Sequence, residues 1–191
     1  MTQLTSCSAT SSHESTWRAG HAVNAGRALG LGMGHRLARI GYSWMALKTW
    51  VKVWLFFLNA VLFAAFAFTP DPLALATLAS LPVTFVLLMV FALRMGGLNR
   101  LMGIGHLIPW LPLLGYLDLR LVSDIAGPRI DPVSEPALFT WALVLGMSLA
   151  ICLALDAWDV VRWQRGERYV LGTIEAHRAG ASNLSGPFAR G

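Results

Sequence analysis

The stretch from Leu73 to Leu93, LALATLASLPVTFVLLMVFAL, decides the fold class, because its 21 residues include no charged side chain. A bilayer core about 30 Å thick is crossed by roughly 20 apolar residues at a rise of about 1.5 Å each. Asp71 and Pro72 precede the stretch as an N-cap and a first helical residue. The stretch therefore predicts a membrane-spanning helix.

Three more apolar runs qualify, or nearly qualify, as spans: residues 50–68, 101–117 and 137–155. The run 101–117 is the weakest, because its glycines and prolines disfavour a regular helix, and we expect it to be kinked at its prolines. The chain is 55% hydrophobic and 13% charged, whereas soluble domains carry about 25% charged residues. We therefore expect an all-α, polytopic membrane protein with four transmembrane helices in an antiparallel bundle over residues 49–165.

Basic residues predict the orientation of these spans. If both termini are cytoplasmic, 13 of the 15 Lys and Arg residues fall on the cytoplasmic side, and Arg120 and Arg129 fall outside. An excess of cytoplasmic positive charge is usual in membrane proteins. Arginine outnumbers lysine 13 to 2, which favours a GC-rich bacterial coding sequence. We therefore expect a multi-pass protein of the bacterial inner membrane, with the lipid bilayer as its first partner.

The two ends of the chain are predicted to be tails. Residues 1–48 form a basic N-terminal tail that we expect to be disordered, with a short interfacial helix at 36–48 as the alternative for its last part. Residues 166–191 are expected to form a flexible C-terminal tail. These tails leave residues 49–165 as the transmembrane domain.

The sequence leaves the translation start open among Met1, Met33 and Met45. Intact-mass measurement of the natively expressed protein distinguishes these starts. A start at Met45 would also allow a signal peptide with Ala65-Phe66-Ala67 as its cleavage site. The bulky residues around that site favour an uncleaved span instead.

His106 is the one ionisable residue well inside a predicted span, about 7–8 Å past the start of that span. The last span runs the opposite way and brings Asp156 to the same depth, near the span ends marked by Arg94 and Arg100. Ionisable groups inside a membrane are costly and mark possible functional sites. A His106–Asp156 pair can relay a proton, bind a quinone head group or, with the arginines, hold a lipid phosphate. In the structural alternative, His106 makes an interhelical hydrogen bond or caps a carbonyl freed by a proline.

Asp156 and Asp159 are three residues apart and therefore lie on one helical face. Such a pair can hold Mg²⁺, which prefers hard oxygen ligands, and it resembles the aspartates of CDP-alcohol phosphotransferases. The glycine of that motif and its second aspartate pair are missing from this chain. We therefore expect no metal and keep Asp159 as a candidate ligand-binding residue. In the competing interpretation, Asp159 pairs with Arg162 at the helix end, and Gly166 stops the helix.

Small residues recur every four positions along two of the spans and predict close helix packing. These packing residues are Ala76, Ser80 and Thr84 in the second span and Ala142, Gly146, Ala150 and Ala154 in the last span. They serve either the bundle itself or another membrane subunit, which can be a second copy of the chain in a homo-oligomer.

The sequence contains no nucleotide-binding loop, zinc-protease motif or nucleophile elbow. Cys7 and Cys152 also lack the spacing of a zinc site. We therefore lean against an enzyme and expect no cofactor, no metal and no nucleic-acid partner. Two function classes stay open. The first is a non-enzymatic accessory, scaffolding or regulatory protein, and the second is a small transporter or a lipid- or quinone-binding subunit centred on His106, Asp156 and the nearby arginines.

Overall fold

The computed structural model describes residues 33–183, so the expectations for residues 1–32 and 184–191 lie outside the described range. Within this range the chain is all-helical and contains no strand. Its elements are α2 (Met33–Met45), α3 (Thr49–Phe63), the 3₁₀-helix η1 (Ala64–Phe68), α4 (Pro72–Met95), the 3₁₀-helix η2 (Arg100–Met102), α5 (Gly103–Val122), α6 (Pro136–Gln164) and α7 (Ile174–Arg178). The predicted all-α class is confirmed for this part of the chain.

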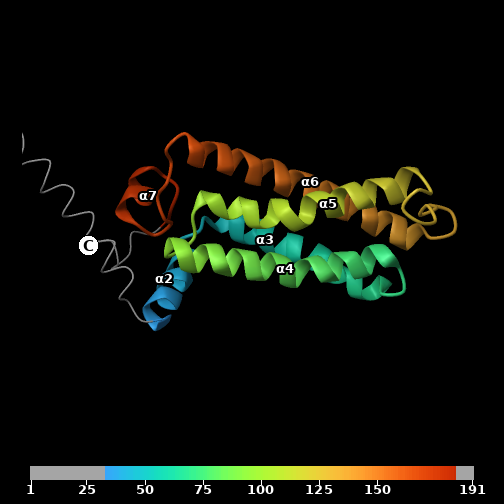
Figure 1. The fold of residues 1–191 in the computed structure, drawn as a ribbon, viewed down its shortest axis with the longest axis horizontal. Coiled ribbons are helices and arrows are strands. Elements are labelled where there is room, and N and C mark those ends of the chain that lie inside the picture. Colours follow the sequence, from blue (N-terminus) through green and yellow to red (C-terminus); the bar gives the residue numbers. More distant parts are fainter. Residues whose placement is uncertain (1–32, 184–191) are drawn as a thin grey trace, which may run out of the picture.

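Three helical segments of the described chain are long and apolar enough to cross a membrane. They are Thr49–Phe68, which combines α3 with η1, and the helices α4 and α6. The run expected as the third span forms α5, a continuous helix of 20 residues that contains Pro109 and Pro112. Helices α3, α4, α5 and α6 lie side by side along the long axis of the molecule (Figure 1). Helix length and composition thus support a membrane protein with transmembrane helices.

Local sequence signals set both ends of α4, and the signal at its start was predicted. Asp71 is the N-cap, and its Oδ1 accepts a hydrogen bond of 2.7 Å from the Leu73 N–H. Pro72 follows as the first helical residue, where its missing N–H costs nothing. At the other end Gly96 takes a left-handed conformation with φ of 71° and closes the helix.

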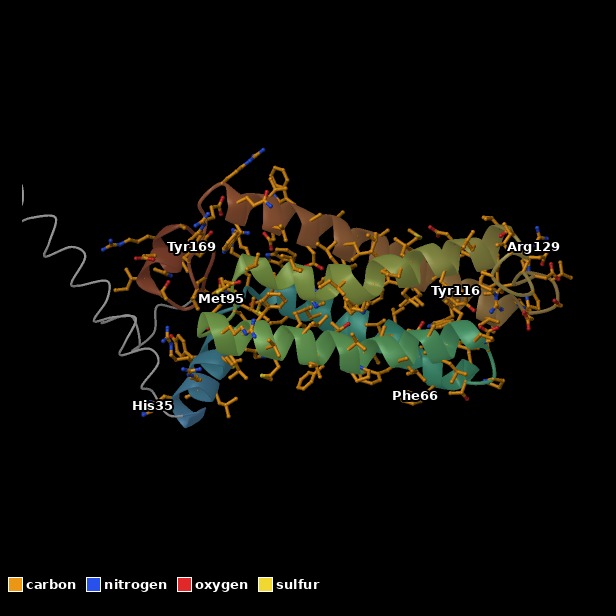
Figure 2. The ribbon with its side chains drawn as sticks, in the orientation of Figure 1. His35, Phe66, Met95, Tyr116, Arg129 and Tyr169 are labelled. Carbon is orange, nitrogen blue, oxygen red and sulfur yellow. The ribbon has the colours of Figure 1, made fainter. Side chains whose placement is uncertain are left out.

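The two ends of the bundle differ in what they carry. Helices α2 and α7 lie at one end, which we call the α7 end, and the turn at 69–71 and the loop 123–135 lie at the other, the loop end (Figure 1). Figure 2 shows His35 and Tyr169 toward the α7 end and Tyr116 and Arg129 toward the loop end.

Residues 166–183, expected to be part of a flexible tail, contact the α7 end in the structure. The Leu171 N–H donates to the carbonyl of Leu98 at 2.8 Å, and the Asn183 N–H donates to the carbonyl of Ala46 at 3.0 Å. A Cβ on Gly172 would come within 2.9 Å of the Tyr42 ring. The segment therefore lies against the end of α2 and the α4–α5 connection.

The core lies between the long helices and consists mainly of leucine. Its most buried leucines are Leu58, Leu62, Leu73, Leu117, Leu145 and Leu149. Trp141 of α6 adds a specific contact, because its indole N–H donates to the carbonyl of Val61 at 2.9 Å and its ring stacks on Phe68. Large apolar side chains such as Phe56 and Phe85 point outward and are exposed, as a surface in contact with lipid tails requires.

The small-residue stripe of α6 packs inside the chain along half of its length. Ala142 is fully buried, and a Cβ on Gly146 would lie 3.1 Å from the Leu117 side chain of α5. Ala150 and Ala154 are exposed. A step of four residues turns about 40° around a helix axis, so the stripe passes from the core to the outer surface.

The stripe of α4 faces the interior along most of its length. Ser80 and Thr84 are buried and Ala76 is half-buried. Both hydroxyls are satisfied within the helix, because Ser80 donates to the carbonyl of Thr77 at 2.7 Å and Thr84 donates to that of Ser80 at 2.8 Å. Ser80 and Thr84 therefore place small polar side chains inside the bundle without leaving a hydrogen-bond donor unsatisfied.

Arg120, which the sequence analysis counted as an outer-loop residue, is buried near the end of α5 with 3% of its surface exposed. Its Nη2 donates to Oδ2 of Asp71 at 2.7 Å, and its Nη1 donates to the Tyr116 hydroxyl at 3.4 Å. Asp71 thus caps α4 and neutralises Arg120. This ion pair joins α4 to α5 at the loop end.

Gly103 allows α5 and α6 to approach closely at the α7 end. A Cβ at this position would lie 2.8 Å from the backbone oxygen of Asp156 and 3.0 Å from its Cβ. Both of these atoms belong to a rigid helix and cannot turn away as the end of a flexible side chain can. The crossing of the two helices therefore requires glycine at this position.

We expect Gly103→Ala to lower the free energy of unfolding by about 1–3 kcal/mol, the usual cost of forcing an extra methyl group into a packed contact. Thermal unfolding in mild detergent measures this effect. Gly115→Ala in the same helix is the matched control, because nothing lies within 4 Å of its added Cβ, and alanine favours a helix by about 0.5–1 kcal/mol over glycine. Equal melting temperatures for the two variants would contradict the close crossing.

Candidate polar site between α5 and α6

His106 and Asp156, predicted to lie at one depth, are in contact between α5 and α6. His106 lies in the first turn of α5, and its Nδ1 is 3.0 Å from Oδ2 of Asp156 in the last part of α6. Both side chains are 16% exposed. A carboxylate beside an imidazole fixes the orientation and tautomer of the ring. The predicted pairing is present, while its use for ligand binding stays a prediction.

Cys152 is the third member of this site, and the sequence analysis did not include it. Its Sγ lies 3.5 Å from Oδ2 of Asp156, and the ligand atoms of His106, Cys152 and Asp156 all lie within 4.8 Å of one another. Cys152 precedes Asp156 by four residues, which places both on one helix face. This spacing is a signal that the sequence contains, and it links Cys152 to Asp156 although no other Cys or His lies near Cys152 in the sequence. We call these three residues the His–Cys–Asp cluster.

Two tryptophan rings adjoin the His–Cys–Asp cluster. Trp110, one turn after His106, is 4% exposed and stacks on the imidazole with ring centroids 4.6 Å apart. Trp54 of α3 lies beside the Cys152 thiol. The indole N–H of Trp110 is buried and lacks a hydrogen-bond partner within residues 33–183. Unpartnered buried donors cost free energy, so the surroundings of the cluster have hydrogen-bonding capacity that the described chain does not use.

Arg100 and Asp159 form a second polar contact nearer to the α7 end. The Nη1 of Arg100 pairs with Oδ1 of Asp159, and its Nη2 donates to the Tyr169 hydroxyl at 2.9 Å. The sequence interpretation paired Asp159 with Arg162 on its own helix, whereas the observed hydrogen bond joins η2 to α6. Asp156 and Asp159 therefore have different hydrogen-bond partners, although the DxxD spacing places them on one helix face.

Glu167 links Arg100 to Arg162. Its Oε2 lies 3.0 Å from Nε of Arg100 and 2.8 Å from Nη2 of Arg162. Its Oε1 accepts a hydrogen bond of 2.9 Å from Nε of Arg162, and its Oε2 accepts one of 3.0 Å from Tyr169. The hydrogen bond from Arg162 is the main cause that lowers the pKa of Glu167. The carboxylate stays ionised and ties the residues after α6 to α6 itself.

The remaining predicted residues at this end of the bundle stand apart from the cluster. Arg94 lies exposed in the last turn of α4, and no hydrogen bond or ion pair between described residues joins it to the His–Cys–Asp cluster. Gly166 follows α6 with φ of 108°, as expected of a residue that stops a helix. The guanidinium of Arg168 lies 4.6 Å from the centre of the Trp163 ring, so this helix end carries cations and aromatic rings.

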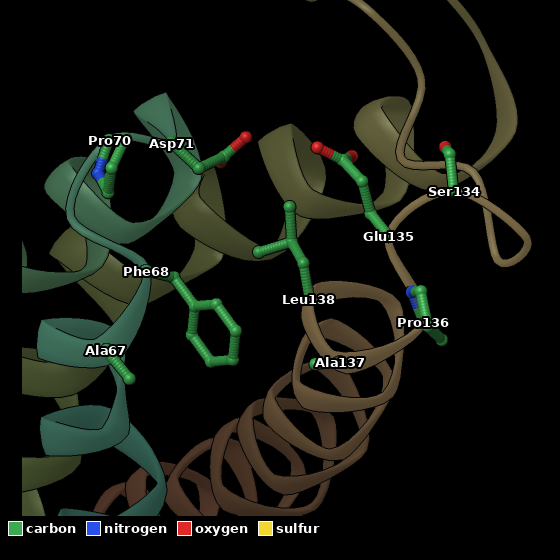
Figure 3. Close-up of a pocket in the computed structure, with 9 residues that line it drawn as sticks. All are labelled: Ala67, Phe68, Pro70, Asp71, Ser134, Glu135, Pro136, Ala137 and Leu138. Carbon is green, nitrogen blue, oxygen red and sulfur yellow. The ribbon is translucent and has the colours of Figure 1, made fainter.

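A cavity of about 500 Å³ opens at the loop end, away from these residues. Figure 3 shows the carboxyl groups of Asp71 and Glu135 facing one another, with Leu138 and the Phe68 ring below them. One oxygen of Asp71 is already paired with Arg120. The cavity contains none of the predicted site residues.

We expect Glu167→Gln to loosen residues 167–183, because the amide loses the charge that binds two arginines. Hydrogen exchange followed by mass spectrometry should show faster exchange in this segment. Glu175→Gln is the control, because Glu175 is exposed on α7 and makes no ion pair with another described residue.

The pH dependence of this contact follows from the same carboxylate. The folded pKa of Glu167 lies below its ordinary value of 4.5, so the contact is fully formed above that pH and is lost as the pH falls through the folded pKa. A loss of protection in residues 167–183 between pH 5 and 8, measured against the intrinsic exchange rate at each pH, would contradict this assignment.

Comparison with known protein families, with curated proteins and with solved structures finds no match to this chain. Any functional conclusion therefore depends on the chemistry of the chain's own residues.

Proposed function

We propose that α3, α4, α5 and α6 all span the membrane. Helix α5 has 20 residues, enough to cross a core about 30 Å thick at about 1.5 Å per residue. It packs between α4 and α6, which shields it from lipid on two sides. Its charged residues, Asp118 and Arg120, lie close to its loop end, and Asp71 neutralises Arg120.

The charge distribution supports cytoplasmic termini. Ten of the twelve lysine and arginine residues within 33–183 belong to the α7 end, and Arg120 and Arg129 belong to the loop end. The loop end also carries five acidic residues, which are Asp71, Asp118, Asp124, Asp131 and Glu135. Cytoplasmic segments carry the excess of positive charge, so the α7 end faces the cytoplasm of the proposed bacterial inner membrane.

Cysteine labelling tests this topology in a chain whose Cys7 and Cys152 are replaced by alanine. We expect a membrane-impermeant thiol reagent to label Asp131→Cys on cells whose inner membrane is intact, because the loop 123–135 faces outward. Arg178→Cys in α7 should react after the membrane is opened. Labelling of both positions in intact cells would contradict the proposed orientation.

We propose that the protein is a ligand-handling membrane protein, a small transporter or a binding subunit, whose site is the His–Cys–Asp cluster. The observation that carries this proposal is the 3.0 Å contact of His106 with Asp156 between two long helices, with Cys152 on the same carboxylate oxygen. Ionisable groups within a membrane domain are costly, and they mark ion, proton or ligand sites.

The contacts of the arginines narrow the kind of ligand. Arg100 is already bound by Asp159 and Glu167, and Arg94 lies outside the cluster. An anionic head group would therefore have to displace two carboxylates to reach Arg100. The cluster itself consists of an imidazole, a thiol and a carboxylate, which bind cations through nitrogen, sulfur and oxygen. This favours a cationic ligand over a lipid phosphate.

A non-enzymatic accessory or scaffolding role is the second candidate, and it has its own observation. Ala150 and Ala154 are exposed on α6, so this part of the small-residue stripe is open to a helix of another subunit or of a second copy. Small residues at such spacing let helix backbones approach closely in membranes. Gly146, by contrast, faces Leu117 of the same chain.

Mass spectrometry of the protein purified in mild detergent separates the two candidates. We expect a small bound species that His106→Gln removes and that the control His35→Gln, in the exposed part of α2, retains. A small species bound equally by both variants would contradict the ligand role. Loss of a co-purifying membrane protein in Ala150→Leu/Ala154→Leu, with no effect of His106→Gln, would favour the accessory role.

A further inference from the structure

We propose that the His–Cys–Asp cluster binds a divalent transition-metal ion of the zinc type. This inference rests on the proposed ligand-handling function and names its ligand class. The three donors are the imidazole Nδ1 of His106, the Sγ of Cys152 and a carboxylate oxygen of Asp156. Imidazole nitrogen, thiolate sulfur and carboxylate oxygen are the three donor types by which proteins bind Zn²⁺.

The ligand atoms already lie close to the separations that a shared ion requires. Bonds of about 2.0–2.3 Å in a tetrahedral site place neighbouring ligand atoms about 3.3–3.8 Å apart. The Nδ1 of His106 and the Sγ of Cys152 lie 3.0 and 3.5 Å from Oδ2 of Asp156, and all three atoms lie within 4.8 Å of one another. Small side-chain rotations would therefore bring the three atoms around one ion.

The helices hold these donors in place. Cys152 and Asp156 occupy successive turns on one face of α6, and His106 reaches them from α5. The crossing of these two helices is fixed by the contact of Gly103 with the backbone of Asp156. Ligands that project from packed helices are better positioned than ligands on loops.

Charge balance favours a doubly charged ion at this depth. On metal binding Cys152 loses its proton to solvent and becomes a thiolate, while Asp156 contributes a second negative charge and His106 stays neutral. The charges of these ligands cancel those of a divalent cation, so the site has no net charge. A neutral complex avoids the large cost of an unpaired charge in a low-dielectric environment.

The tryptophans supply the surroundings that a metal site needs. The buried indole N–H of Trp54 lies beside the thiol and can donate a hydrogen bond to a thiolate. Trp110 stacks on His106 and holds the ring plane. Groups in this outer layer orient metal ligands and adjust their basicity.

The donor set also selects among metal ions. Mg²⁺ and Ca²⁺ require several oxygen ligands, whereas this cluster offers one carboxylate together with sulfur and nitrogen. Soft sulfur and borderline nitrogen ligands favour Zn²⁺ and its neighbours. Three protein ligands leave one position of a tetrahedron for water or an exogenous group.

Titration with Co²⁺, a spectroscopic substitute for Zn²⁺, tests the proposal on the full chain in mild detergent. In the Cys7→Ser background Cys152 is the one remaining thiol. We expect a thiolate-to-cobalt charge-transfer band and tetrahedral d–d bands, both removed by Zn²⁺. Cys152→Ser should lose the charge-transfer band, and His106→Gln and Asp156→Asn should weaken binding strongly. His35→Gln and Asp118→Asn, which change exposed residues of α2 and α5, should behave as the Cys7→Ser parent.

Alkylation of Cys152 provides a second measurement on the Cys7→Ser parent that needs no cluster variant to fold. Zn²⁺ at 100 times its Kd leaves about 1% of the thiol free, so labelling by a small membrane-permeant reagent should slow about 100-fold. Unchanged labelling, or a charge-transfer band that persists in Cys152→Ser, would overturn the metal site.

These outcomes separate the metal inference from the proposed function. A bound lipid, quinone or other organic species that depends on His106, together with no effect of Zn²⁺ on Cys152, would overturn the metal site and leave the ligand role standing. If there is neither a bound organic species nor an effect of Zn²⁺ on Cys152, the metal site and the ligand role are both overturned. In that case the cluster acts as an interhelical hydrogen-bond contact in which Asp156 accepts from His106 and Cys152.

Discussion

The close crossing of α5 and α6 at Gly103 is the contact on which the polar site depends. Because a Cβ would collide with the backbone of Asp156, the absence of a side chain lets the two helix backbones touch. His106, one turn later on α5, then reaches the Asp156 carboxylate, and Arg100, just before Gly103, reaches Asp159. The close packing of α5 against α6 therefore makes both of these polar contacts possible.

A low-dielectric surrounding explains why each charged group between the helices has a polar partner. An isolated buried charge is too costly, so Arg120 at the loop end is matched by the carboxylate of Asp71. Toward the α7 end, the carboxylate of Asp156 lies within hydrogen-bond distance of the His106 imidazole. Each pair joins α5 to a different neighbour, α4 at one end and α6 at the other. Together they fix the position of α5 along its axis, which apolar packing alone specifies weakly because a sliding helix exchanges one leucine contact for another.

The sequence predicted those features of the fold that depend on neighbouring residues along the chain or on the depth of a residue in a bilayer. The N-cap at Asp71 involves a partner two residues away, and helix length follows from apolar runs. The prediction that His106 and Asp156 lie at the same depth followed from counting residues along two spans of opposite direction. The Arg120–Asp71 pair joins residues 49 positions apart, and it depends on the rotation of each helix about its axis, which four short apolar patterns leave undetermined.

Helix rotation also decides which carboxylate belongs to the site. A step of three residues from Asp156 to Asp159 turns about 60° back around the axis, and a step of four from Cys152 to Asp156 turns about 40° forward. Either spacing keeps two side chains on one face, so sequence alone does not choose between a Cys–Asp pair and a DxxD pair. Helix α5 makes the choice, because Arg100 binds Asp159 and leaves Asp156 to His106 and Cys152. The arginine that neutralises Asp159 therefore makes the cluster a mixed nitrogen, sulfur and oxygen site rather than a pair of carboxylates suited to magnesium.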